Sequence, residues 1–270
     1  VAPRALSALD VSTFAAPVNE KVVTLWSEFL SALTDPTVDK ITLAADLTAS
    51  SSASMVARPS LEIDGQGHEI NFGTTTSYSI TMPQASAEGS VLTVKNLKYT
   101  GNNTTSIFDA SAANSNNWMI NFENITTLSG ASRALLTAAN SVVTISGTNV
   151  LNITRSSVMI TAKEVYIQGT ETERASVTIN DGSHFVSSSI ANGKFLIENA
   201  DITVEKVSSL FNVTGATSQF SIKNSKIVTT SIGNLIYGAS IDITVNDSIF
   251  DIPSITNFIY GTLVNTTISN

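Results

Sequence analysis

The sequence repeats itself with a period of 23 to 28 residues from residue 54 to its end. Successive repeat units begin at Ser54, Tyr78, Ser106, Arg133, Ser157, His184, Ser209, Asn234 and Asn257. A period of this length is typical of solenoids, in which each unit forms one coil and buries its apolar side chains by stacking on its neighbours. The repeat is therefore the strongest constraint on the fold.

Each unit contains three short apolar strands separated by polar residues. SLFNV and NLIYG are first strands, FSIKN and FLIEN are second strands, and SKIVTT and ADITVEK are third strands. The second strand ends at a residue type that tolerates the left-handed backbone of a sharp corner. In successive units this corner residue is Asn96, Asn124, Gly147, Asp181, Asn199, Asn224 and Asp247. Three strands and three corners per unit predict an all-β fold, a right-handed parallel β-helix (β-solenoid) of about nine coils.

Charged residues one repeat apart have opposite signs, which supports this register. The pairs are Glu198 with Lys223, Asp201 with Lys226, and Lys95 with Glu123. We expect each pair to lie on adjacent coils.

One amphipathic helix precedes the repeats. Between Val18 and Leu33 the apolar residues recur every three or four positions, Asn19 is a candidate N-cap, and Asp35-Pro36 ends the pattern. A solenoid end needs a cover for its core, so we predict a capping helix over residues 18–35 and coils over 40–270, together one domain. Residues 1–17 are predicted to be a linker, and the absence of a second cap predicts a fragment of a longer protein.

Composition narrows the function. Charged residues make up 13% of the chain and the formal net charge is −8, which argues against nucleic acid as a partner. No apolar run is long enough to insert into a membrane, and the absence of cysteine excludes thiol catalysis and disulfides. Neither composition nor motifs indicate a cofactor or an oligomeric state.

The stretch LWSEFLSALTDPTVDKITLAADLTAS, followed by LEIDGQGHEINF, resembles the pectate lyase-like adhesive domains of Gram-positive (Lactobacillales/Listeria-type) surface proteins. The residues that carry the resemblance are Asp46-Leu47 and the turn from Asp64 to His68. It is specific over Val18 to Phe72 and architectural beyond. It implies an extracellular, non-catalytic adhesin domain, secreted or anchored to the cell wall through regions outside this chain. Some members of that family bind acidic plant polysaccharide or host glycans, so the resemblance implies a glycan or a host or plant surface as the partner.

The chemistry of pectate lyases and related hydrolases is not recognisable. Those enzymes need several carboxylates on one strand face with a cation nearby, and the chain has no Asn-Thr-Asp, Asp-Asp or Arg-Ile-Lys segment. The acidic stretch from Glu164 to Glu205 is better explained by ion pairs and solvation, and the turn from Asp64 to His68 by a tight corner. We therefore predict no enzyme and no metal site.

The candidate ligand site lies on the first strands. The inward residues are expected to be Phe108, Leu135, Met159, Val186, Phe211, Ile236 and Ile259, and the outward ones Asp109, Leu136, Ile160, Ser187, Asn212, Tyr237 and Tyr260. Tyr237 and Tyr260 occur one coil apart in NLIYG and NFIYG and are candidates for stacking on sugar rings. Four basic residues near the start of this strand suit carboxylated sugars: Arg133, Arg155, His184 and Lys206. If His184 contacts a polyanion, binding should strengthen as the pH falls through about 6.5.

Several alternatives remain open. The tyrosines can instead pack beneath a neighbouring domain, and the cations can neutralise local acids; outward Leu136 and Ile160 favour that alternative. The domain can also be a structural or self-associating module of the kind used in aggregation and biofilms, or a binder of a host protein. A polysaccharide lyase or hydrolase ranks last.

Overall fold

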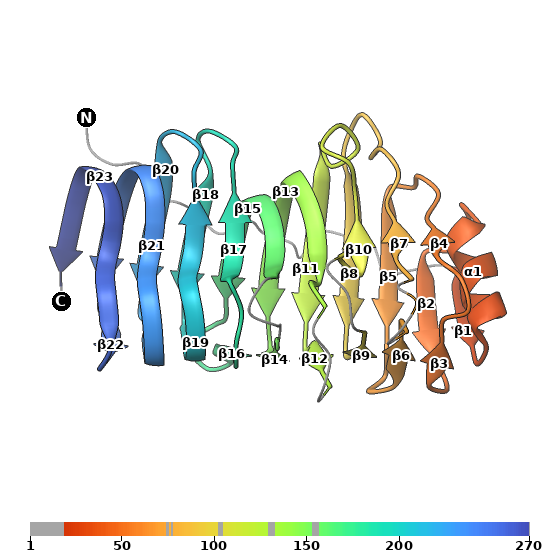
Figure 1. Ribbon diagram of the computed structural model, residues 1–270. Coiled ribbons are helices and arrows are strands. Elements are labelled where there is room, and N and C mark those ends of the chain that lie inside the picture. Colours follow the sequence, from red (N-terminus) through yellow and green to blue (C-terminus); the bar gives the residue numbers. More distant parts are fainter. Residues whose placement is uncertain are drawn as a thin grey trace.

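A computed structural model describes residues 19–73, 76, 78–101, 105–128, 133–152 and 157–269. The chain forms an elongated β-solenoid of about nine coils, with helix α1 (Trp26–Thr34) at one end and strand β23 (Ile255–Ser269) at the other (Figure 1). Neighbouring coils pair in parallel, as the repeat predicts. The predicted linker over residues 1–17 lies outside the described residues.

Three parallel sheets run along the solenoid, one for each strand of the repeat (Figure 1). First strands are β4 (Ala53–Ser54), β7 (Ile80–Thr81), β10 (Phe108–Asp109) and β17 (His184–Ser188). Second strands are β1 (Glu20–Val23), β2 (Lys40–Leu43), β5 (Ser60–Asp64), β8 (Ser90–Lys95), β11 (Trp118–Glu123), β18 (Lys194–Glu198) and β20 (Ser218–Lys223). Third strands are β3 (Leu47–Thr48), β6 (Glu69–Asn71), β9 (Lys98–Thr100), β12 (Thr126–Thr127), β14 (Thr148–Val150), β16 (Ala175–Ile179) and β22 (Ile249–Asp251).

Longer strands continue around the corners. These are β13 (Leu136–Ser146), β15 (Val158–Gln168), β19 (Ala200–Val213), β21 (Lys226–Asn246) and the terminal β23. The register shifts where β13 pairs with β15 and where β21 pairs with β23. In β19 and β21 the third strand of one coil continues directly into the first strand of the next. The face built by these coils is therefore continuous around that corner.

The core is a column of stacked apolar side chains inside the coils. Phe195, Phe211 and Phe220 are buried, and their ring centroids lie 4.8 to 5.7 Å apart. Because the coils repeat at the spacing of paired strands, side chains of one type stack on themselves along the axis. This packing stabilises a chain that has no disulfides.

The predicted corner after the second strand is confirmed, with one correction. Asn96, Asn124, Asn199 and Asn224 all have a positive φ between 44° and 56°. Their amides stack: Asn124 Nδ2 donates to Asn96 Oδ1 over 3.0 Å, and Asn224 Nδ2 donates to Asn199 Oδ1 over 2.7 Å.

Asp181 does not belong to this ladder, because it follows the third strand β16. Gly169 occupies the place, since it follows β15 and its carbonyl accepts a hydrogen bond from Asn199 Nδ2.

The N-terminal cap is shorter than predicted. Residues 20–23 form β1, which pairs in parallel with β2, and the helix begins at Trp26 with Leu25 as its N-cap. Glu28 accepts hydrogen bonds from the backbone N–H groups of Thr24 and Leu25, which places the N-cap at Leu25 and not at the predicted Asn19.

The helix nevertheless covers the core as expected. Trp26 and Phe29 are buried, with ring centroids 5.1 Å apart, and Trp26 meets Phe72 edge-on at 6.0 Å. Arg58, for which the sequence suggested no role, contacts the C-terminal end of the helix. Its buried guanidinium donates to the carbonyl of Leu33, in the last turn of the helix, and to the carbonyl of Val38, in the segment that follows it.

The charge pairs are in register, but only one forms the predicted bridge. Lys223 Nζ lies 2.9 Å from Glu198. Asp201 lies opposite Lys226 but accepts a bidentate pair of bonds from Arg174. Lys95 lies opposite Glu123 but contacts Glu62, at 3.1 Å, on the coil before it.

Candidate functional site

The outward side chains of the first strands form one continuous row, which we call the first-strand face. Register places these residues in the row: Thr81, Asp109, Thr137, Thr161, Ser187, Asn212, Tyr237 and Tyr260. All are partly or fully exposed. The inward row beside it consists of Ile80, Phe108, Leu136, Ile160, Val186, Phe211, Ile236 and Ile259.

Two coils correct the prediction by one residue. Leu136 and Ile160 were expected to point outwards, but both are buried, and Thr137 and Thr161 take the outward positions. Leu135 is buried as well, because the chain turns a corner there and two successive side chains point inwards. The correction removes the apolar residues that had favoured a covered surface over an open one.

Tyr237 and Tyr260 form a stacked pair at the C-terminal end of this face. Their ring centroids are 5.0 Å apart and their planes differ by 7°. The two residues are 39% and 54% exposed, so the outer part of the stack is open to solvent. Since they are register partners on adjacent coils, the spacing of the strands holds them parallel.

A column of hydrogen-bonding side chains lies three residues before the tyrosines on each coil. Asn257 Nδ2 donates to Asn234 Oδ1 over 2.9 Å, and Asn234 Nδ2 donates to Ser209 Oγ over 3.2 Å. His184 heads this column, because it is the register partner of Ser209. Asn212, next to Tyr237 in the outward row, has a side-chain oxygen without a partner among the described residues.

A shallow groove of about 310 Å³ runs beside this column. Lys206 and Asp181 are its charged lining residues, and Ser208, Ser231 and Gly233 line its floor. A Cβ at position 233 would meet the Ser208 carbonyl oxygen at 2.4 Å, so glycine allows the backbones of these two coils to approach each other here. Lys206 is thus the predicted basic residue that does lie on this surface.

His184 is placed on this surface but is half-buried. Burial lowers the pKa of His184 below its ordinary value, and a backbone hydrogen bond with Ser209 acts in the opposite direction. Its Nδ1 has no partner among the described residues. Burial therefore favours the neutral form of the His184 ring.

Arg133 is not a surface residue, contrary to prediction. Its side chain is 0% exposed, and its guanidinium donates to the Thr105 carbonyl (2.7 Å) and to Ser79 Oγ (2.6 Å). It also lies 5.9 Å from the centre of the Phe72 ring. Desolvation lowers the pKa of Arg133 to about 10, so it stays charged while tying three coils together from inside.

Of the two remaining predicted residues, Asp109 does not join the tyrosine pair. Arg155 lies outside the described residues. Asp109 is on the first-strand face, but five coil steps separate it from Tyr237, roughly 24 Å at the spacing of paired strands. Its carboxylate accepts a 3.3 Å hydrogen bond from Ser106.

In the described part of the chain, no group of three or more histidine, aspartate or glutamate side chains is placed to hold a metal ion. Asp64 and His68 lie in one turn but have separate roles. Asp64 is buried, yet hydrogen bonds from Asn96 and Gln66 hold its pKa below the ordinary value. His68 Nδ1 lies 3.1 Å from Asp46 on the preceding coil. The tight corner with a positive φ at Gln66 and Gly67 is as predicted.

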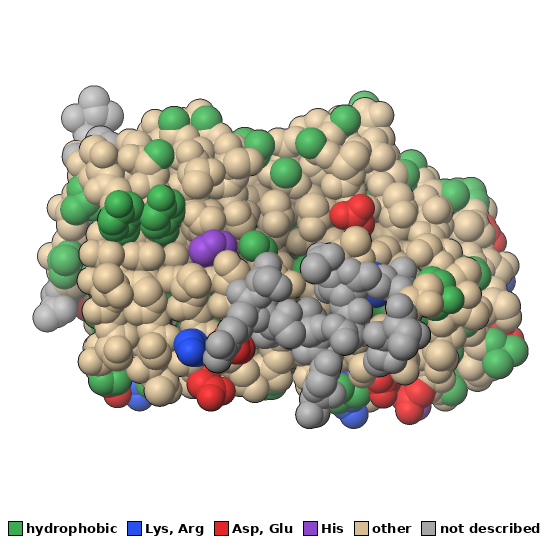
Figure 2. All heavy atoms as spheres, viewed as in Figure 1, with side chains coloured by type: hydrophobic (Ala, Val, Ile, Leu, Met, Phe, Trp, Pro, Cys, Tyr) green, Lys and Arg blue, Asp and Glu red, His purple; other side chains and the backbone are tan. Residues whose placement is uncertain are grey.

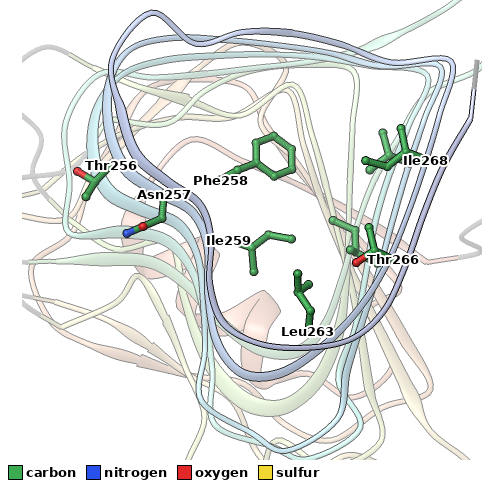
Figure 3. Close-up of a pocket in the computed structure, with 9 residues that line it drawn as sticks. Thr256, Asn257, Phe258, Ile259, Leu263, Thr266 and Ile268 are labelled. Atoms are coloured by element: carbon green, nitrogen blue, oxygen red, sulfur yellow. The ribbon is translucent and has the colours of Figure 1, made fainter.

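A larger hollow of about 480 Å³ lies at the C-terminal end. Phe258, Ile259 and Leu263 point into the space enclosed by the last coil (Figure 3). This hollow is the interior of the solenoid seen from its end, so it belongs to the core. Figure 2 shows one side of the solenoid. Few hydrophobic and few charged side chains are visible on its described surface, which consists mostly of other side chains and backbone.

Comparison with known proteins finds one matching family and similar solved structures. Residues 20–135 match the model of the pectate lyase-like adhesive domain family, which confirms the resemblance seen at the capping helix and the first turns. The structure is similar to the SRRP of L. reuteri 53608, with a TM-score of 0.66 and 15% identity over 93% of this chain and 99% of that one. It is also similar to the SRRP of L. reuteri 100-23, with a TM-score of 0.59 and 12% identity over 92% and 98% of the two chains. No curated protein matches the sequence significantly.

The structural similarity shows the β-solenoid fold, and the adhesive-domain family matches the N-terminal part of the chain. In the part of the chain that the structure describes, no helix is long and apolar enough to cross a membrane.

Proposed function

We propose that this chain is a non-catalytic adhesin domain that binds glycans of a host or plant surface through its first-strand face. The binding residues are Tyr237 and Tyr260, with Asn212, His184 and Lys206 beside them. The domain acts outside the cell, secreted or held at the wall of a Gram-positive bacterium through regions beyond this chain. It uses no cofactor.

The observation that carries this proposal is the exposed tyrosine pair. Aromatic rings offer large, rigid contact area at low entropic cost, and their faces pack against the C–H groups of sugar rings. Asn234 and Asn257 supply both donors and acceptors at a fixed spacing on the same two coils. A saccharide has apolar C–H faces beside regularly spaced hydroxyl groups, and these match the tyrosine rings and the asparagine side chains.

The proposal is tested on a glycan array that includes polygalacturonate, at pH values of about 5 and 7.4. Wild-type protein is compared with the double variant Tyr237→Ala/Tyr260→Ala, whose fold is checked by circular dichroism. Glycan binding that disappears in the variant supports the proposal. Binding retained in the variant keeps the function but moves the site, and no binding to any glycan would favour a protein ligand or self-association.

A further inference from the structure

The sheet built by the second strands carries an apolar stripe on its outer side. Side chains alternate along a strand, so every second residue of these strands points away from the core. On three successive coils, register pairs one outward apolar residue with the next, and on the following two coils the stripe continues two residues further along the strand. The residues of this stripe are Val91, Met119, Val142, Tyr166 and Leu196.

Two residues of the stripe are buried although they point outwards. Elsewhere on the solenoid, the outward residues Tyr237 and Ile249 are 39% and 61% exposed. Tyr166 and Leu196 are 4% and 2% exposed, which is the burial of core residues. A side chain that leaves the sheet on its outer side reaches this burial beneath another part of the protein, so the stripe must have a cover.

No helix or strand of the described ranges supplies this cover. The second strands contact strands of the same and the neighbouring coils, and α1 packs against β1 and β4 at the end of the solenoid. The undescribed stretches between the coils are one to four residues long, and each joins a third strand to a first strand. Residues 1–18 are a longer stretch, and they adjoin the second-strand sheet at β1 through Asn19.

Residues 1–18 have the length and the composition that the stripe requires. The Asn19 carbonyl accepts hydrogen bonds from the N–H groups of Asp39 and Lys40, so the segment joins the solenoid beside the first coils of the second-strand sheet. Seven steps of strand pairing separate β1 from β18, which carries Leu196, or about 34 Å. Eighteen extended residues span up to about 59 Å. Apolar side chains recur along the segment, and the largest are Leu6, Leu9 and Phe14.

We infer that residues 1–18 form an intramolecular strap, docked by its apolar side chains on the stripe from Val91 to Leu196. The strap takes the place of the linker that the sequence predicts for this segment. It ties the first coil of the solenoid to the coil of Leu196, and it covers an apolar patch that would promote association with other molecules if it were open. The inference concerns the outer side of the second strands, and it does not depend on the proposed glycan-binding function.

Hydroxyl-radical footprinting, read by peptide mass spectrometry, measures the exposure of these side chains in the full chain. Two matched comparisons serve as internal references: Tyr166 with Tyr237, and Leu196 with Ile249. In the wild type, the stripe residue of each comparison should be oxidised at least about tenfold more slowly than its reference. In the variant Leu6→Asp/Leu9→Asp/Phe14→Asp, this difference should fall below about threefold, because carboxylates do not dock on an apolar surface.

A second triple variant is the matched control. Ser7→Asp/Ser12→Asp/Thr13→Asp adds the same charge to the same segment at polar positions, and it should protect the stripe as the wild type does. Circular dichroism checks the fold of both variants. If the apolar triple variant does not fold, the single variant Phe14→Asp replaces it and should change the oxidation of Tyr166 and Leu196 in the same direction.

The other outcomes would overturn the inference. Equal oxidation within each comparison in the wild type would mean that the stripe is open. Protection that survives in the folded apolar variant would mean that another part of the protein covers the stripe, and protection lost in both triple variants would mean that the apolar side chains do not hold the strap. Protection that falls on dilution from about 100 to about 1 μM would assign the cover to a second copy of the chain.

Discussion

Asn124 allows a test of the stacked asparagines at the corner after the second strand. At this position a glycine variant should be more stable than an alanine variant, the reverse of the order in a strand. Its backbone has a φ of 56°, its Nδ2 donates to Asn96, and its Oδ1 accepts the N–H of Thr148 over 2.8 Å. Either substitution loses two hydrogen bonds, about 2 kcal/mol at roughly 1 kcal/mol each. Alanine adds about 1 kcal/mol of left-handed strain, which glycine avoids. We therefore expect destabilisation of about 2 kcal/mol for Asn124→Gly and about 3 kcal/mol for Asn124→Ala.

The control is Asn121, three residues earlier on β11, where the backbone is extended and Nδ2 donates to Thr93. In a strand, glycine is less stable than alanine by roughly 0.5–1 kcal/mol, so the order should be opposite at this position. Urea and thermal unfolding, followed by circular dichroism, measure both pairs of variants. The same order of alanine and glycine at positions 121 and 124 would refute the claim that the left-handed corner constrains the sequence.

Three further predictions concern the cap, the surface and the histidine. Arg58→Met should cost about 1–3 kcal/mol, because the carbonyls of Leu33 in α1 and of Val38 after it lose the buried guanidinium donor, and hydrogen exchange should accelerate in that helix first. Lys223→Gln should change stability by less than about 1 kcal/mol, because its ion pair with Glu198 is solvated, and high salt should erase even that effect. The pKa of His184 is lower in the folded state than the unfolded value of about 6.5, so the unfolded chain takes up the proton first as the pH falls. Stability present above about pH 6.5 should therefore decline on acidification, and His184→Gln should remove that part of the decline in matched thermal melts; parallel pH profiles would contradict it.

The sequence predicted the coils because the period and the corner residues are local properties. An asparagine two residues beyond an apolar strand residue needs no tertiary information to indicate a left-handed corner, and Asn96, Asn199 and Asn224 behave as expected. Where two successive apolar residues meet a corner, alternation no longer determines direction. Leu135 and Leu136 are both buried, so the outward residue predicted for this coil is wrong by one position.

The site was less predictable, because burial depends on contacts between distant coils. Arg133 occupies the start of a repeat unit like His184, yet it turns inwards to reach Ser79, 54 residues earlier. The predicted helix begins too early because Val22 and Val23 suit the apolar face of a helix. They also suit a strand, and parallel pairing with β2 decides between the two. The tyrosine pair, by contrast, followed directly from matching positions in successive repeats.

The central claim is that the exposed rings of Tyr237 and Tyr260 hold the ligand. The most direct test compares the wild type with Tyr237→Phe/Tyr260→Phe and Tyr237→Ala/Tyr260→Ala, using surface plasmon resonance against the best glycan from the array. Phenylalanine keeps the stacking surface, so its affinity should stay within about threefold of the wild type, whereas alanine should weaken binding by at least about tenfold. Unchanged affinity in the alanine variant, with its fold intact, would contradict the account.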